Sequence, residues 1–132
     1  MHEFHAWLGL SDSTEEDDQE YLRTVAAHLR ARIDALPEWP SARYRVENLI
    51  GQLFLTMDGF TNHWGSEARF MEELLALVQE WLPGAWGIVY EHDDETRQAP
   101  GPNAYRVRVM ARGVLTERVD PFLSPVNPTI ED

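Results

Sequence analysis

The chain has 132 residues, of which 43% are hydrophobic and 11% aromatic, so it is long and apolar enough for one domain that buries about two-thirds of its unfolded surface. It contains no cysteine, which excludes disulfides, thiolate metal sites and a thiol nucleophile. Its 23 acidic and 11 basic residues give a net charge of −12, which disfavours nucleic acid and anionic lipid as partners and favours a basic one.

No stretch of the sequence is apolar over the length needed to cross a membrane. The first eight residues also lack the basic region and the long apolar run of a signal peptide. We therefore expect a cytoplasmic protein without a membrane partner.

The first half of the chain predicts a strand, a helix and a hairpin. Residues 4–10 are apolar on both faces of an alternating pattern, which is typical of a central strand. A helix is expected to begin within the acidic run 11–20, because Ser13 and Glu16 have the spacing of a capping box, and to stop before Pro37. Its apolar stripe comprises Leu22, Val25, Leu29, Ile33 and Leu36. Residues 44–50 and 52–58 then predict two strands joined at Gly51.

The second half predicts another helix and two more strands. Ser66 is positioned to cap a helix that runs to about Leu82, and residues 86–90 alternate as a fourth strand. In residues 105–112 the apolar side chains fall on one face and three arginines on the other, which predicts a half-buried fifth strand. The segment 115–132 combines three prolines with spaced apolar residues, so we expect an extended strap across the domain.

Together these elements predict a single α+β domain over residues 1–132. Its order is β-α-β-β-α-β-β, with a mostly antiparallel five-stranded sheet and both helices on one face, as in a variant of the ferredoxin-like fold. The arginine face of the fifth strand would then lie on the face without helices.

The sequence holds few residues that suit catalysis or a cofactor. His92 is followed by two aspartates and a glutamate, a pattern that fits a general base or a hard-cation site but is also typical of a solvated turn. His2 and His5 point to opposite faces of a strand, which disfavours a shared metal. Neither a nucleophile elbow nor a phosphate-binding glycine loop is present. We expect no catalytic, cofactor or metal site, and keep a small hydrolase using His92 with Asp93 or Asp94 as the alternative.

The arginine stripe of Arg106, Arg108 and Arg112 has two interpretations. It resembles a surface that binds nucleic acid, but three arginines in so acidic a chain are better explained by ion pairs within the protein. Candidate partners for such pairs are Glu47, Asp58, Glu131 and Asp132.

Two acidic segments are candidate docking sites for a basic partner, although solvated surface also explains them. Their carboxylates belong to Glu15, Glu16, Asp17, Asp18, Glu20, Asp93, Asp94 and Glu95. Trp39 is the candidate anchor between two prolines, and Phe60 and Trp64 are further loop aromatics of this kind.

Five stretches of the sequence resemble the immunity protein 7 family of bacterial polymorphic toxin systems. They are Glu3 to Trp7, Ser13 to Asp18, Gly59 to His63, Ala111 to Gly113 and, most specifically, Asp120 to Asp132. The likeness spans nearly the whole chain; a glycine is frequent in the family where Ala6 stands here. It implies a small cytoplasmic α+β protein that binds and neutralises a cognate toxin domain, without catalytic residues of its own.

Our leading hypothesis is therefore a stoichiometric inhibitor that occludes the active site of a toxin or an adjacent exosite. Because the chain is acidic, we expect a basic toxin, and nucleases fit that description. The sequence leaves open which toxin is bound and whether the protein associates with itself.

Overall fold

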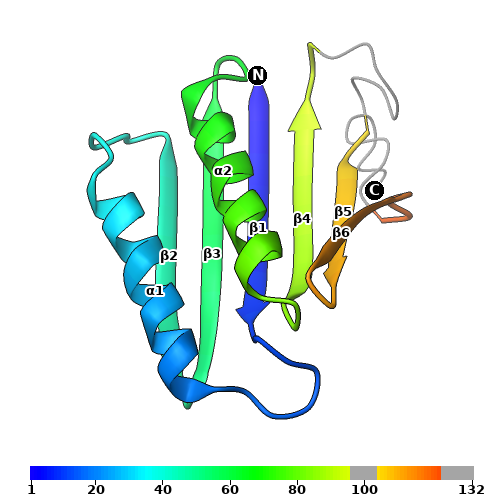
Figure 1. Ribbon diagram of the computed structural model, residues 1–132. Coiled ribbons are helices and arrows are strands. Elements are labelled where there is room, and N and C mark those ends of the chain that lie inside the picture. Colours follow the sequence, from blue (N-terminus) through cyan, green and yellow to red (C-terminus); the bar gives the residue numbers. More distant parts are fainter. Residues whose placement is uncertain (96–103, 123–132) are drawn as a thin grey trace.

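The computed structural model describes residues 1–95 and 104–122 of the chain, and within them it contains six strands and two helices (Figure 1). The strands are β1 (His2–Leu10), β2 (Ala42–Leu49), β3 (Gln52–Thr61), β4 (Trp86–Asp93), β5 (Arg106–Ala111) and β6 (Val114–Arg118). The helices are α1 (Gln19–Asp34) and α2 (Ser66–Trp81). In this part of the chain neither helix is long and apolar enough to cross a membrane.

The strands form one sheet in the order β2-β3-β1-β4-β5-β6, and every neighbouring pair is antiparallel. The first four strands have the order of a ferredoxin-like unit, and β5 and β6 extend the sheet beyond β4. The expected α+β architecture with a central first strand is thus confirmed.

The sheet has six strands and not the expected five. Arg112 and Gly113 both have positive φ, at 50° and 70°, so the chain turns back on itself and β6 pairs with β5. Strand β6 thus includes the first residues of the segment 115–132 in which we expected a strap. Residues 119–122 follow β6 without regular secondary structure, and residues 123–132, where the segment ends, lie outside the described residues.

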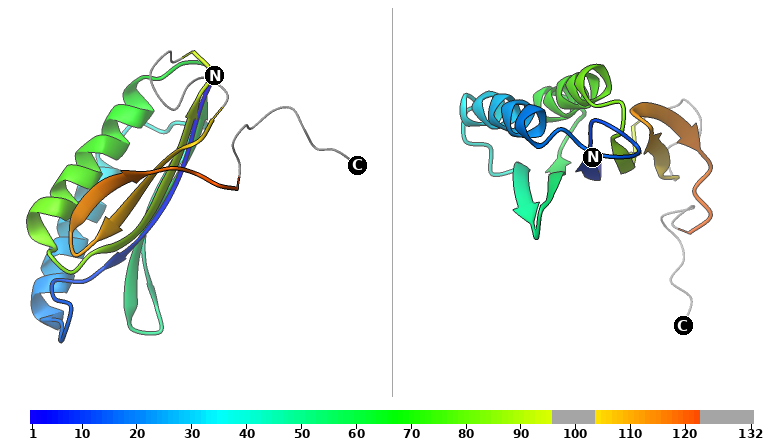
Figure 2. Two further views of the ribbon diagram at one scale, coloured as in Figure 1. Left: turned by 90° about the vertical axis from the view of Figure 1, so that its right-hand side faces the viewer. Right: turned by 60° about the horizontal axis from the view of Figure 1, so that its bottom comes forward.

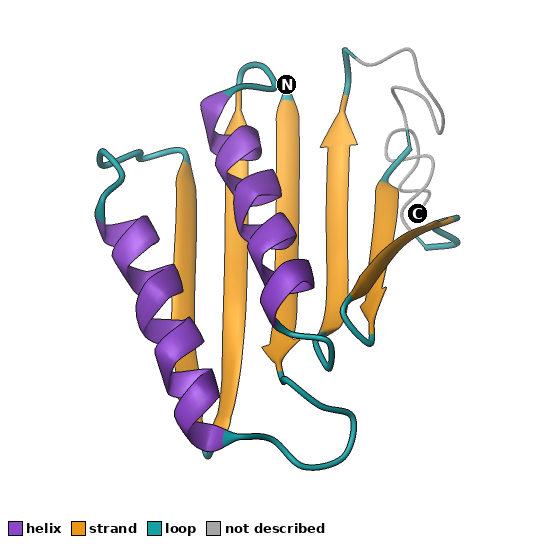
Figure 3. Cartoon of the chain, in the orientation of Figure 1, coloured by secondary structure: helices purple, strands orange, loops and turns teal. Residues whose placement is uncertain are grey.

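Both helices pack on one face of the sheet, and among the described residues no helix lies on the other face (Figures 2 and 3). The core between the layers is apolar, and from β1 it takes the even-numbered residues Phe4, Ala6, Leu8 and Leu10. These four side chains are at most 5% exposed. Helix α2 adds side chains spaced three and four residues apart, as a helix with one buried face requires. They are Phe70, Met71, Leu74, Leu75 and Val78.

Helix α1 begins later than the capping-box pattern predicted. Its N-cap is Asp18, whose Oδ1 accepts the backbone N–H groups of Glu20 and Tyr21 at 3.1 Å each. The side chain of Ser13 instead accepts the N–H of Glu15 within a loop. Asp18 competes successfully because a cap must stand directly before the first apolar turn, which starts at Leu22.

Two other local predictions differ in outcome. The N-cap of α2 is Gly65 and makes no side-chain cap hydrogen bond, so Ser66 is the first helical residue and not the cap. The hairpin of β2 and β3 is confirmed: Ile50 and Gly51 have positive φ, at 49° and 86°, and Asn48 Oδ1 accepts the Gly51 N–H at 2.9 Å. This two-residue turn is the type in which glycine relieves backbone strain.

Candidate functional site

The two acidic segments lie at opposite ends of the sheet. Residues 11–18 follow the end of β1, whereas Asp93 at the end of β4 is the cross-strand partner of His2 at the beginning of β1. A nine-residue strand is about 30 Å long, so the two segments do not form one continuous patch (Figure 1).

Several of the predicted carboxylates make hydrogen bonds within their own loop. Asp17 is half-buried and accepts hydrogen bonds from the Ser11 hydroxyl at 3.3 Å and from the Asp12 N–H at 3.0 Å. Asp18 caps α1. Glu15, Glu16 and Glu20 are exposed and are therefore the members of this segment that remain accessible to a partner.

The second acidic segment is bound to the N-terminal end of β1. Asp94 forms an ion pair with the amino group of Met1, and the hydrogen bond and charge of that amine hold the pKa of Asp94 below its usual range. Glu95 lies 2.7 Å from His63 Nδ1, and its backbone N–H donates to Asp93 Oδ1 at 3.0 Å. Both Asp94 and Glu95 remain about half exposed.

His92 is not arranged as a catalytic base with its neighbouring aspartates. Its ring packs against Tyr105, with the ring centroids 5.4 Å apart, and its Nε2 is buried without a hydrogen-bond partner among the described residues. The hydrogen bond of Asp93 and the ion pair of Asp94 go to other groups, as described above. The described contacts therefore do not bring His92 together with Asp93 or Asp94 as an acid–base pair.

The arginines of β5 face the helix layer, not the open face as the alternation suggested. Arg108 is the cross-strand partner of the core residue Val89 and is only 7% exposed. Its guanidinium lies 2.5 Å from Glu72 on α2 and 3.6 Å from Glu91 on β4. Arg106 pairs with Glu91 and with Glu117 of β6.

The ion-pair interpretation of these arginines is confirmed for Arg106 and Arg108, although the partner carboxylates are not those expected. Arg112 lies beyond β5, in the turn to β6, so the three arginines do not form a stripe. Of the proposed partners, Glu131 and Asp132 lie outside the described residues. The signal that was missed is Glu72, which α2 brings to the core side of β5 from 36 residues away.

Glu91 is the buried centre of this network. His2 Nε2 lies 2.6 Å from Glu91 Oε2, and His2 is itself completely buried. Burial opposes ionisation of Glu91, but the His2 hydrogen bond and the charge of Arg108 together lower the pKa of this carboxyl. The network holds β1, β4, β5 and α2 together, so its role is structural.

Three aromatic side chains gather on the sheet face that the helices leave uncovered. Trp86 packs edge-on against Trp7 and Phe54, with ring centroids 5.8 and 5.9 Å apart. The indole of Trp86 lies over Gly9, where a Cβ atom would overlap it. Trp7 is 48% exposed and Trp86 40% exposed. We call Trp7, Phe54 and Trp86 the aromatic cluster; exposed aromatic groups of this kind are typical of protein interfaces.

A histidine between two carboxylates lies on the same face. His5 Nε2 is 2.6 Å from Glu3 and its Nδ1 is 2.7 Å from Asp58 on β3. Partial burial opposes the charged ring, but these two hydrogen bonds raise the pKa of His5 above 6.5. Glu3 also accepts a hydrogen bond from the Tyr105 hydroxyl at 3.1 Å. The uncovered face therefore carries ionisable groups as well as aromatic ones.

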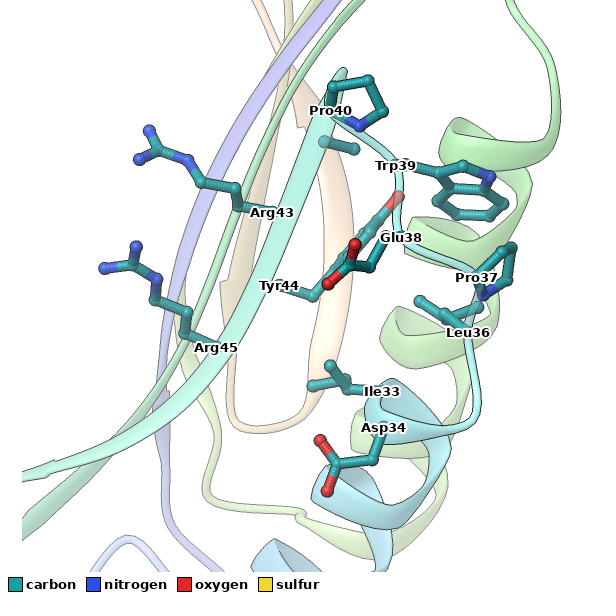
Figure 4. A pocket seen from close by; sticks show the side chains of 11 residues that line it. Ile33, Asp34, Leu36, Pro37, Glu38, Trp39, Pro40, Arg43, Tyr44 and Arg45 are labelled. Atoms are coloured by element: carbon teal, nitrogen blue, oxygen red, sulfur yellow. The ribbon is translucent and has the colours of Figure 1, made fainter.

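Trp39 lies beside a groove between the C-terminal end of α1 and the edge strand β2 (Figure 4). The groove has a volume of about 610 Å³. Trp39 is half-buried and packs against Tyr44, with ring centroids 6.3 Å apart. It thus both covers part of the core and borders an open groove.

The sequence did not reveal the aromatic cluster as a candidate site. Alternation indicated that both faces of β1 are largely apolar, as suits a central strand, but we expected the face without helices to carry arginines and not an aromatic cluster. The helices cover only one of these faces. The available signal was Trp7, a large side chain that shares one face of the alternating segment with the small Gly9.

One comparison with known protein families matches the whole chain, including all the residues described above. The model of the family described as immunity protein 7 matches residues 1–132, the whole chain. The chain belongs to the immunity protein 7 family. The resemblance seen in the sequence is thereby confirmed, and membership implies an immunity protein directed against a toxin.

Other comparisons add little to the immunity protein 7 assignment. No curated protein matches this sequence at a significant level. Among solved structures, a phage SAM lyase in its apo state is similar at 16% identity over 92% of this chain and 90% of that chain. Its TM-score is 0.24, too low to support an argument about fold or activity.

Proposed function

We propose that this protein neutralises a cognate toxin domain in the cytoplasm by binding it stoichiometrically and occluding its active site or an adjacent exosite. It acts as an inhibitor and not as an enzyme. The observation that carries the proposal is the aromatic cluster on the uncovered sheet face, in a chain that belongs to an immunity protein family along its whole length.

The aromatic cluster is suited to the centre of such an interface. Interface hot spots are enriched in tryptophan, and burying an exposed aromatic ring against a partner removes a large apolar area from water. The cluster is also held in place before binding, because the Trp86 indole rests on Gly9 and contacts two neighbouring rings. A preformed surface loses little side-chain entropy on association.

The charge of the chain favours a basic toxin, and a nuclease is the class that fits best. A net charge of −12 attracts a basic domain over a distance of about a Debye length and speeds its encounter with the inhibitor. The exposed carboxylates of Glu15, Glu16 and Glu20 at one end of the sheet, with Asp94 and Glu95 at the other, contribute to that attraction. We propose that they steer the toxin, whereas the aromatic cluster anchors it.

Co-expression with the toxin domain encoded beside this gene tests the proposal. We expect restored growth and a one-to-one complex that co-purifies. The variant His92→Ala should restore growth equally well, because the inhibition requires no catalytic base. If the toxin kills its host in the presence of the protein, or if rescue depends on His92 and occurs without a complex, the proposal is wrong, and in the second case a hydrolase replaces it.

A further inference from the structure

The groove beside Trp39 is a second docking site on this molecule, separate from the aromatic cluster. We propose that it accepts a lysine or arginine side chain, together with a neighbouring apolar side chain, from an extended segment of the cognate toxin. This inference rests on the function proposed above and names the chemistry of one contact with the toxin.

Apolar side chains form part of the lining of the groove. They comprise Ile33, Leu36, Pro37, Trp39 and Tyr44. Tyr44 is fixed by an edge-on contact with Phe70, at 4.9 Å between centroids, and by its hydroxyl, which donates to the Glu67 carbonyl at 2.6 Å. The volume of about 610 Å³ lies in the range of roughly 300–1,000 Å³ that is usual for ligand sites.

The acidic side chains of the groove determine which partner fits. Asp34 and Glu38 are exposed, and their carboxylates lie on the groove side of β2 (Figure 4). Arg43 and Arg45 also border the groove, but their side chains extend to the opposite side of the strand (Figure 4). A cationic side chain in the groove would therefore meet two carboxylates over an apolar floor, where its aliphatic stem can also be buried.

The edge position of β2 explains why the groove is open and why an extended segment suits it. Among the strands that the structure describes, none pairs with β2 on its outer side. Arg30 of α1 donates two hydrogen bonds to the Val46 carbonyl, at 3.2 and 3.0 Å, so this carbonyl points outward from the sheet. Because backbone direction alternates along a strand, the backbone groups of Tyr44 point outward as well, toward the groove. An extended segment can bond to them as it would to a sheet edge.

Trp39 adds a contact that extends beyond the groove. It also borders a second hollow of about 360 Å³, which is lined by Ser66, Arg69, Phe70 and Glu73. A toxin residue beside the cation can thus pack against either side of the indole. Tryptophan between two hollows has the amphipathic contact area that hot spots use.

The test compares two charge reversals that are matched in net charge. Asp34→Lys with Glu38→Lys alters the groove, and Glu15→Lys with Glu16→Lys alters the exposed loop before α1. Each pair changes the net charge of −12 by the same four units, so long-range attraction is weakened equally. Asp34 is the last residue of α1, where a lysine is favourable to the helix dipole, so the groove variant is expected to fold.

Dissociation constants for the neighbouring toxin domain are measured by calorimetry for the wild type and both variants. We expect both variants to lose long-range attraction, and the groove variant to bind about tenfold more weakly than the loop variant, which corresponds to about 1.4 kcal/mol. Trp39→Ala should also weaken binding, whereas Trp64→Ala, an exposed tryptophan outside the groove, should not.

The outcomes separate the two proposals. If the wild type forms no complex with the toxin, the proposed function fails and the docking site fails with it. If the complex forms but the groove variant binds like the wild type, or if both charge reversals weaken binding equally, the groove is not a docking site while the function stands.

Discussion

Arg108 shows how a single residue can have a role that its sequence position conceals. It occupies the same strand as the exposed Arg106, yet it is 7% exposed and lies between two carboxylates. A buried charge requires such partners because its desolvation costs several kcal/mol. The pairing of Arg108 with Glu72 is therefore part of what fixes α2 on the sheet.

Removal of Arg108 should destabilise the fold. Arg108→Ala leaves the buried carboxylate of Glu91 with one fewer cation, and we expect the free energy of unfolding to fall by about 3 kcal/mol. Urea denaturation followed by circular dichroism measures the change. Arg118→Ala is the control, because Arg118 is exposed and its described hydrogen bond goes to a backbone carbonyl. Equal stability of the two variants would contradict a structural role for the network.

His5 should titrate above its ordinary pKa because Glu3 and Asp58 both favour the charged ring. A raised pKa in the folded state means that this contribution to stability is fully present below pH 6.5 and is lost as the pH rises through the folded value. Asp58→Asn should lower the pKa of His5, as measured by NMR titration of the ring protons. Glu47→Gln, an exposed carboxylate that pairs with Arg45, should leave it unchanged. A His5 pKa unaffected by Asp58→Asn would refute the contact.

At the scale of elements, the start of α1 depends on one side chain. The acidic run before α1 contains several residues that can cap a helix, but the structure uses Asp18, because it directly precedes the turn that packs on the sheet. The remaining acidic residues form a loop instead. That loop follows the central strand, so its position is set by β1 at one end and by Asp18 at the other.

Loss of this cap should cost about 1 kcal/mol. Asp18→Ala leaves the N–H groups of Glu20 and Tyr21 without their acceptor, whereas Asp18→Asn keeps an oxygen in place and should cost only a few tenths of a kcal/mol. Thermal unfolding gives the difference. Ser13→Ala tests the capping box directly: if it destabilises the helix as much as Asp18→Ala does, α1 begins earlier than the structure indicates.

At the scale of the whole molecule, both helices lie on one sheet face, and within residues 1–95 and 104–122 no helix covers the other. The aromatic cluster and the His5 contacts share that face, while the groove at Trp39 lies beside the edge strand β2. The net charge acts over the entire surface. The aromatic cluster, the ion pairs at the groove and the long-range attraction of the net charge can therefore be altered by different substitutions.

Truncation of the aromatic cluster should weaken toxin binding and spare the fold. Because Trp7 and Trp86 are each at least 40% exposed, we expect Trp7→Ala and Trp86→Ala to cost about 2 kcal/mol of binding free energy, with a smaller effect on unfolding. Calorimetric titration of the neighbouring toxin domain and urea denaturation measure the two quantities. Trp64→Ala is the control for loss of an exposed tryptophan. Undiminished binding by both cluster variants would place the toxin on another surface.

The sequence by itself determined the α+β class, the central first strand, the hairpin at Gly51 and the family. Each of these depends on patterns within a few residues: the period of apolar side chains, turn residues with positive φ, and short family motifs. It also indicated that Arg106 and Arg108 form ion pairs, because their charge has to be balanced in an acidic chain.

Only the tertiary structure decided which faces are covered and which residues meet. The same alternation describes Trp7 whether a helix covers it or not, and Glu72 meets Arg108 only because α2 packs on the sheet face to which Arg108 points. The two acidic segments lie far apart for the same reason. Strands β1 and β4 are antiparallel, so the last residues of β1 and the last residues of β4 lie at opposite ends of the sheet. Contacts between residues distant in sequence depend on how layers pack, and a local pattern does not contain that information.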